Sequence, residues 1–329
     1  MAKDNLFLGM ARGKVGDVVF SRLNGVQVTR ARNRAPRNPQ SPAQMVQRII
    51  MSSVGKAYSL MSGICDHSFE GFETGQLSQR KFMEVNVGQL RDKVADVLAY
   101  PVEEVVKAST AFNFSFKNDY APVLNQYMMS AGSLPTIDLV PETEGGWRSM
   151  IALNLGEILP DAVTYADIVS MLGLLPGDQL TFCQVTHDGQ ATGHDKDIMN
   201  GFRYARVILE PSDGDMTSPF IVGGAINKPN ERNSGSFASI IITAVEGDIP
   251  AGLRFRLKDV DLAANGARAV CGSAVILSRQ TGGRWLRSTQ FLLPRTTSGS
   301  QALNSSTLGL AYETYLLNSA SDLYLNQAT

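Results

Sequence analysis

Residues 14–34 read KVGDVVFSRLNGVQVTRARNR, and this stretch specifies how the chain begins to fold. Apolar side chains recur at every second position in two runs, residues 18–21 and residues 26–29. Between the runs, Asn24-Gly25 is typical of a type I′ turn because both residues tolerate a positive φ angle. The pattern predicts a β-hairpin near the N-terminus.

The hairpin is followed by a proline-rich segment and then by helical patterns. Three prolines between residues 36 and 42 exclude regular structure as far as Ser41. Ser41 fits an N-cap and Pro42 fits the first helical position, so a helix is expected over about 42–62. A second apolar stripe predicts a helix over about 76–98, and a short helix is expected at 101–110.

From residue 111 the sequence changes to short alternating runs separated by turn residues. Strands are expected at residues 112–116, 151–155, 179–185, 203–209, 237–245, 253–258, 269–278 and 284–293. Thr164 is expected to cap one inserted helix, and a last helix is expected near 307–317. The fold class is therefore α+β and mainly β, with an antiparallel β-sandwich that is either jelly-roll-like or Ig-like.

This reading divides the chain into three parts. Residues 1–40 form a basic hairpin arm with its proline-rich strap, residues 41–110 form a helical segment, and residues 111–329 form a β-rich body.

The net charge of −1 conceals a strong asymmetry along the chain. The first fifty residues carry nine basic and two acidic side chains, a net charge of +7, and the remainder carries −8. A basic arm on an acidic chain is typical of proteins that bind a polyanion or dock onto a neighbouring subunit.

The basic arm supplies the candidate binding residues. Arg30, Arg32 and Arg34 alternate with small or polar residues, so in a strand they project from one face about 7 Å apart. Guanidinium groups suit bidentate contacts to phosphate or carboxylate. Three partners remain open: nucleic acid, an acidic surface of a second copy, or acids of the same chain. The full candidate set is Arg12, Lys14, Arg22, Arg30, Arg32, Arg34, Arg37 and Arg48.

The sequence offers little sign of catalytic or cofactor chemistry. Cys65, Cys183 and Cys271 share no metal-ligand spacing, and no phosphate loop, dinucleotide fingerprint or GxSxG motif occurs. His187 and His194 lie in a polar stretch that matches neither HExxH nor an EF-hand loop. We therefore expect no enzyme activity, cofactor or metal, and the start lacks the apolar core of a signal peptide. No apolar run is long enough for a membrane span.

Residues 13–48 also resemble a known group of sequences. Their shared pattern is G-K-x-G, a strand, N-G or K-G, a second strand ending in Arg, and N-P-x-[ST]-x-A-Q-x-x-x-R. The matching positions are Gly13, Lys14, Gly16, Gly25, Arg30, Asn38, Pro39, Ser41, Ala43, Gln44 and Arg48. The run resembles the N-terminus of proteins from gut phages, small single-stranded DNA elements and Bacteroidetes genomes. The rest of the chain is similar only loosely, through the closing hairpin SRQTGGRWLRST.

The resemblance carries no established activity, and its genomic context implies a virion or nucleic-acid-packaging role. Together with the arm, it favours a self-assembling capsid or nucleocapsid-type coat protein, located in the virion or the host cytoplasm. Its expected partners are further copies of itself and nucleic acid, in particular single-stranded DNA. The alternatives are a non-structural single-strand-binding protein and a phage head or tail accessory protein.

Overall fold

The computed structural model describes residues 13–23, 26–33, 42–97, 125–141, 149–187, 199–209, 215–228, 237–260 and 269–294. The chain divides into two compact units, Met1–Ser41 and Pro42–Thr329. The expected helices at 101–110 and 307–317, the strand at 112–116 and the proline-rich strap at 34–40 lie outside the described residues.

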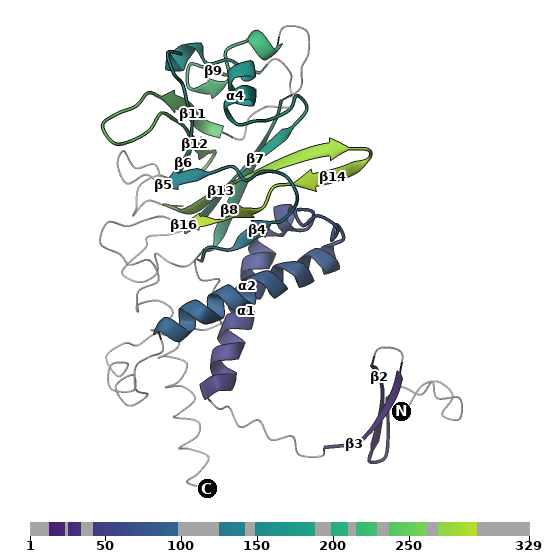
Figure 1. Ribbon diagram of the computed structural model, residues 1–329. Helices are drawn as coiled ribbons and strands as arrows, with labels where there is room; N and C mark the ends of the chain where they lie inside the picture. Colours follow the sequence, from purple (N-terminus) through teal and green to yellow (C-terminus); the bar gives the residue numbers. More distant parts are fainter. Residues whose placement is uncertain are drawn as a thin grey trace, which may run out of the picture. The chain divides into compact units, whose positions relative to one another are not determined.

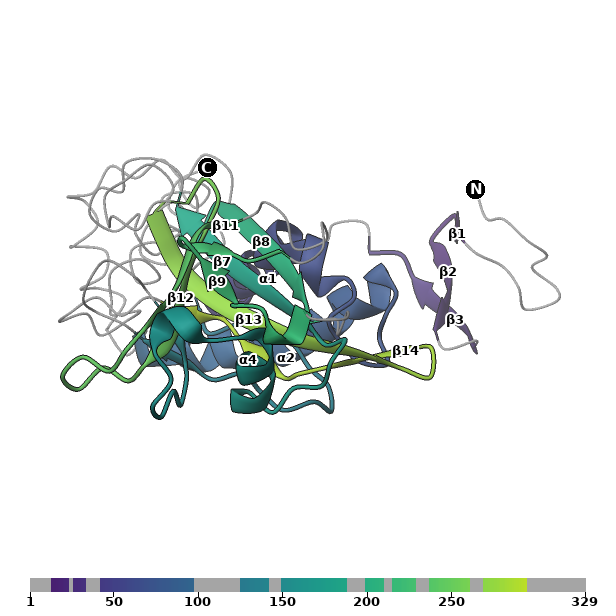
Figure 2. The same cartoon turned by 90° about the horizontal axis from the view of Figure 1, so that it is seen from above.

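The first unit contains a three-stranded antiparallel sheet rather than a simple hairpin (β2 and β3 in Figure 1, all three strands in Figure 2). Strand β2 (Val18–Leu23) pairs with β3 (Val26–Ala31), which confirms the expected hairpin, although its Asn24-Gly25 turn is outside the description. The sequence alone missed β1 (Gly13–Val15), which pairs with the other side of β2. Gly16 takes a φ of 57° in the turn between β1 and β2, a conformation that glycine adopts without strain.

The second unit begins with two long helices. Helix α1 (Pro42–Cys65) starts at the proline expected to open it, and α2 (Gly75–Val97) follows the second predicted stripe. Buried Asn86 of α2 ties the helix to β4 (Met128–Ser130): its amide exchanges two hydrogen bonds with the backbone of Met128, 2.7 and 3.1 Å long. Strand β4 also pairs with β15 (Gln290–Phe291), so the helices and the end of the described chain are linked through it.

The larger sheet of the second unit is built from two hairpins that are far apart in sequence. Its order is β14-β13-β7-β8, with β16 also paired to β13. The strands are β7 (Gln179–His187), β8 (Gly201–Ile208), β13 (Ala269–Thr281), β14 (Arg284–Arg287) and β16 (Leu293–Pro294). The hairpin β7–β8 joins β13–β14 through the antiparallel pair β7·β13, with one register shift between Val270 and Gly272.

A four-stranded sheet repeats this arrangement, and its order is β11-β12-β6-β5. The strands are β5 (Leu139–Pro141), β6 (Ser149–Ala152), β11 (Phe237–Thr243) and β12 (Gly252–Leu257). Two hairpins again join by their inner strands, here β6 and β12. A small hairpin, β9 (Ile221–Val222) with β10 (Ala225–Ile226), lies beside β11, where Ile240 N–H donates to Gly224 O at 3.0 Å.

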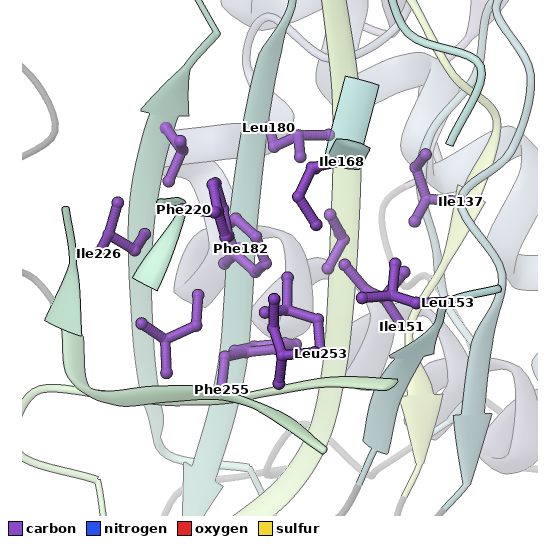
Figure 3. Close-up of a cluster of buried hydrophobic side chains, with 14 of the residues drawn as sticks. Ile137, Ile151, Leu153, Ile168, Leu180, Phe182, Phe220, Ile226, Leu253 and Phe255 are labelled. Carbon is purple, nitrogen blue, oxygen red and sulfur yellow. The ribbon is translucent and has the colours of Figure 1, made fainter. Parts of the chain in front are cut away.

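One hydrophobic cluster receives side chains from both of these sheets (Figure 3). Phe182 of the larger sheet meets Phe255 of the smaller sheet edge-on, with ring centroids 4.9 Å apart. Buried Gln184 adds a polar connection, because its side chain donates to Phe255 O at 3.3 Å and accepts from Leu257 N–H at 2.9 Å. Each fully buried side chain of this size contributes about 1.5–3 kcal/mol of transfer free energy.

A second cluster lies on the opposite face of the larger sheet, where α1 and α2 cover it (Figures 1 and 2). Ile50, Met61 and Phe82 of the helices pack there with Cys183 and Val185 of β7 and their neighbours. The larger sheet thus has its two faces buried against different partners, which explains why β7 and β13 are apolar on both sides.

The expected inserted helix is present as α4 (Tyr165–Met171), between β6 and β7. Thr164 and Asp167 form a capping box, in which the Thr164 side chain accepts from Asp167 N–H and the Asp167 carboxylate accepts from Thr164 N–H. Short 3₁₀ turns, η2 (Pro160–Ala162) and η4 (Asp215–Thr217), flank this region.

Candidate functional site

The pairing of the arm strands determines which basic residues share a face. Val19 of β2 lies opposite Arg30 on one side and opposite Lys14 on the other. Directly opposed residues in antiparallel strands project from the same face, so Lys14 and Arg30 belong to one face of the sheet. The strands are about 4.8 Å apart, which places these two residues about 10 Å apart across the sheet.

Arg32 follows directly after β3 and is exposed. Its backbone N–H donates to Asp17 O at 2.6 Å, which extends the pairing of β2 and β3 by one residue. Because Arg32 stands two residues after Arg30, the alternation expected from the sequence continues to this position. Lys14, Arg30 and Arg32 are therefore the described part of the candidate cationic face.

The side chains of the other five candidate residues lie outside the description, so none of them can be assigned to this face. Arg12, Arg34 and Arg37 lie outside the described residues. The backbone of Arg22 pairs with Gln27 in the β2–β3 register, while its side chain is outside the description. Arg48 belongs to α1, which is part of the second unit, and its side chain is also outside the description.

The arm sheet has an unusual surface composition. Within residues 13–23 and 26–33, no side chain that the structure describes is buried, and Val15 and Val26 are 52% and 65% exposed. Small sheets are stable in water only when one apolar face is covered. The arm sheet therefore combines cations with uncovered apolar side chains, as expected for a segment that gains stability when it binds.

Residues of the second unit that the sequence analysis did not select form another cationic group. Arg206 of β8 lies over the ring of Tyr204, with its guanidinium carbon 5.5 Å from the ring centroid. Arg287 of β14 lies over Trp285 at 4.8 Å. Both pairs have the pattern aromatic-x-Arg within a strand, and this spacing is the signal in the sequence that could have found them.

Cys65 and His67, two residues apart in sequence, form hydrogen bonds with different partners. Cys65 is fully buried at the end of α1, and its thiol donates to Met129 O at 3.7 Å. Burial is the main cause that raises the pKa of Cys65 well above its ordinary value, which opposes thiolate formation. His67 instead uses Nδ1 in a 2.9 Å hydrogen bond with Glu73 O.

Among the residues that the structure describes, no group of three or more potential ligands is arranged to hold a metal ion. The polar stretch that contains His194 lies in the undescribed residues 188–198, so the metal candidate there has no structural description. No helix in the described ranges is long and apolar enough to cross a membrane.

Comparisons with known proteins give no relative for this chain: no family model, no curated protein and no solved structure matches it.

Proposed function

We propose that this protein is a coat subunit of a viral or phage particle, which self-assembles through its basic N-terminal arm. The observation that carries the proposal is the arm sheet β1–β3, which forms a unit of its own, presents cations on one face and buries none of its described side chains. Such a segment is suited to binding an acidic surface outside its own unit. We place the protein in the virion or the host cytoplasm.

The charge distribution favours a second copy of the chain as the partner of the arm. The chain is nearly neutral overall at −1, although its first fifty residues carry nine basic side chains. The acidic excess therefore resides in the remainder of every copy, and a neighbouring copy supplies the charge that the arm lacks.

The body of such a subunit is, in this proposal, an immunoglobulin-like β-sandwich. Support comes from the chain order of the hairpins: β5–β6, β7–β8, β11–β12 and β13–β14 alternate between the two sheets. The orders β5-β6-β12-β11 and β8-β7-β13-β14 correspond to the A-B-E-D and C′-C-F-G orders of that fold. This correspondence favours the Ig-like alternative over a jelly roll.

Assembly of the full-length protein tests the proposal. We expect closed or extended particles by negative-stain electron microscopy and a species much larger than a monomer by light scattering. The double variant Arg30→Gln/Arg32→Gln should shift the protein towards monomers. The matched control, Arg80→Gln/Lys258→Gln, removes two exposed positive charges from the second unit and should assemble normally. A wild-type protein that stays monomeric with and without DNA would contradict the coat function.

A second candidate is a non-structural protein that binds single-stranded nucleic acid, and the exposed cations of the arm favour it too. In that case small oligomers should bind DNA, with an affinity that decreases steeply as salt increases. The Arg30→Gln/Arg32→Gln variant would then lose DNA affinity without a change in oligomeric state, whereas a coat subunit would change its assembly.

A further inference from the structure

The helix-facing side of the larger sheet carries a second group of cations, which belongs to the second unit and not to the arm. We call the four residues Tyr204, Arg206, Trp285 and Arg287 the aromatic–arginine surface. The β-sheet register places them on the same face: Arg206 is in register with Thr181, Tyr204 with Cys183, and Arg287 with Ser278. Cys183, Ala274 and Ile276 of this face pack with the helices, so the surface adjoins the covered part of the face.

Both rings of the surface are accessible to solvent. Tyr204 is 43% exposed and Trp285 is 36% exposed, which places both among the exposed large apolar side chains of the described residues. Each ring carries an arginine, so a planar π surface and a guanidinium stand together twice. Nucleobases stack on aromatic rings and on arginine planes regardless of their sequence.

The acidic side chains that act on Arg287, Glu70 and Glu73, do so without forming an ion pair. No carboxylate among the described residues forms an ion pair with Arg206 or Arg287, and Nη1 of Arg287 is buried with no hydrogen-bond partner. The Arg287 side chain is anchored through Nε, which donates to His67 O at 3.0 Å. A buried guanidinium nitrogen without a partner is costly, and an anion would satisfy it once the side chain turned towards solvent.

The charges around Arg287 also favour the binding of an anion beside it. Burial first, and then the positive charge of Arg206, lower the pKa of Arg287, while Glu73 and Glu70 act in the opposite direction. Glu70 accepts hydrogen bonds from the backbone and the hydroxyl of Ser133 and, at 3.5 Å, from the backbone N–H of Arg287, but it forms no ion pair with the guanidinium. The repulsion between the two guanidinium groups would decrease if a phosphate lay near both of them.

The dimensions of the surface fit a short single strand. Tyr204 and Trp285 are separated by three strand spacings and by six residues along the strands, about 14 Å and about 20 Å, or about 24 Å diagonally. Along this diagonal the two arginines stand on the two edge strands, and the positions between them, Thr181, Ile276 and Ser278, are buried. A nucleic-acid strand would therefore pass over the residues that cover these positions on its way from one aromatic–arginine pair to the other. The length of the diagonal is comparable with the shortest sites of single-strand-binding domains, about four nucleotides.

We propose that the aromatic–arginine surface binds single-stranded nucleic acid, with bases stacked on Tyr204 and Trp285 and phosphates held by Arg206 and Arg287. The proposal goes beyond the coat function, because it depends on neither the arm nor self-assembly. In a coat subunit, it would provide contact with the genome while the arm contacts a neighbouring copy.

Tryptophan fluorescence tests the site directly. Trp285 is one of two tryptophans, so the full-length variant Trp147→Phe leaves it as the sole emitter. Titration with an oligothymidylate of about ten nucleotides should quench this emission saturably, because stacking on the ring is the binding mode. Two phosphate contacts predict a slope of about −1.4 for the logarithm of the binding constant against the logarithm of salt concentration.

Further substitutions in the Trp147→Phe variant should change the binding constant or its salt slope in specific ways. Tyr204→Ala should weaken binding about tenfold through the loss of one stacked base. Arg206→Gln should reduce the size of the salt slope by about 0.7 through the loss of one phosphate contact. Arg80→Gln, the charge-matched control on α2, should change neither quantity.

The outcomes separate this inference from the coat function. Oligonucleotide binding that leaves Trp285 emission unchanged, or binding that only Arg30→Gln/Arg32→Gln weakens, would overturn the inference and leave assembly unaffected. Equal quenching by poly-glutamate would also overturn it, since the surface would then recognise anions in general. Quenching by a protein that never assembles would support the surface and contradict the coat function.

Discussion

At the residue scale, a largely buried ion pair joins Asp178, just before β7, to Arg279 of β13. Arg279 donates from Nε and Nη2 to the two carboxylate oxygens, and both distances are 2.7 Å. Asp178 is 1% exposed and also accepts from Leu175 N–H at 2.9 Å. The hydrogen bonds that Arg279 donates to Asp178 raise the pKa of Arg279, so its guanidinium stays charged across the usual pH range.

Replacing one member of this pair should be costly. Asp178→Asn should lower the free energy of unfolding by about 3 kcal/mol, because it leaves a guanidinium partly buried without its counter-ion. Urea denaturation followed by circular dichroism measures the change. Glu84→Gln is the matched control: Glu84 pairs with Lys81 at 2.9 Å on the exposed side of α2, and its loss should cost less than about 0.5 kcal/mol. Equal effects of the two substitutions would contradict this account.

Glu70 should make stability depend on pH. Burial acts to raise the pKa of Glu70, but hydrogen bonds from Ser133 and Arg287 and the charge of Arg287 lower it overall. A carboxyl group with a lowered folded-state pKa contributes stability above its unfolded pKa of about 4.3, and that contribution is lost as the pH falls through the folded pKa. Glu70→Gln should therefore lower Tm at pH 7 by the equivalent of about 1 kcal/mol.

The difference in Tm between wild type and Glu70→Gln should decrease as the pH falls below about 4.3 and disappear once the pH is below the lowered folded-state pKa of Glu70. Differential scanning calorimetry across this pH range provides the measurement. A difference that is constant with pH would show that Glu70 acts through packing rather than charge.

At the element scale, the close approach of the segment after β4 to the end of β14 requires glycine. A Cβ atom at Gly132 would lie 2.3 Å from Arg287 O and 2.6 Å from a carboxylate oxygen of Glu70. The backbone oxygen cannot move without disturbing the β13–β14 hairpin. Gly55 is different, because it lies within α1 and a Cβ atom there would meet nothing within 4 Å.

Gly132→Ala should therefore destabilise the second unit by about 2 kcal/mol or more, in the range of substitutions that force a backbone shift. Gly55→Ala should stabilise it by about 1 kcal/mol, because alanine loses less backbone entropy in a helix than glycine. Thermal denaturation of the two variants beside wild type measures both changes. Shifts of Tm in the same direction would contradict the roles assigned to these two glycines.

The boundaries of single elements could be predicted from the sequence where a local signal determines them. Pro42 marks the start of α1, and Thr164 with Asp167 marks the start of α4. Strand β1 was missed because it has only three residues, and its turn at Gly16 resembled a simple bend. Local patterns predict such elements because turn and cap chemistry acts over a few residues.

Pairings between distant hairpins were not predictable in the same way. Strand β7 pairs with β13, and β6 pairs with β12, although about ninety to one hundred residues separate each pair in sequence. For the same reason, the aromatic–arginine surface was missed, since Tyr204 and Trp285 belong to different hairpins. Side-chain alternation specifies which residues share a strand face, but not which strands become neighbours.

At the scale of the whole molecule, the two units differ in how they are stabilised. The second unit contains two clusters of buried apolar residues, and the larger sheet lies between them. The described part of the first unit contains no buried side chain. We therefore expect the free energy that holds β1–β3 together to come from outside its described residues, in contrast to the second unit, which has its own core.

This contrast gives a prediction for hydrogen exchange of the full-length protein. At low concentration, where the protein is monomeric, backbone amides of residues 13–33 should exchange almost as fast as those of an unfolded peptide. Assembly at high concentration should protect these amides, because the partner surface covers the exposed apolar side chains and stabilises the strand pairing. Amides of β13 serve as the internal reference, since this strand has a paired neighbour on each side and its buried residues should be protected at both concentrations.

Mass spectrometry of peptides from the two regions measures the exchange. Strong protection of residues 13–33 in the monomer would mean that the arm sheet is stable without a partner, and unchanged exchange after assembly would mean that the arm is not part of the interface between copies.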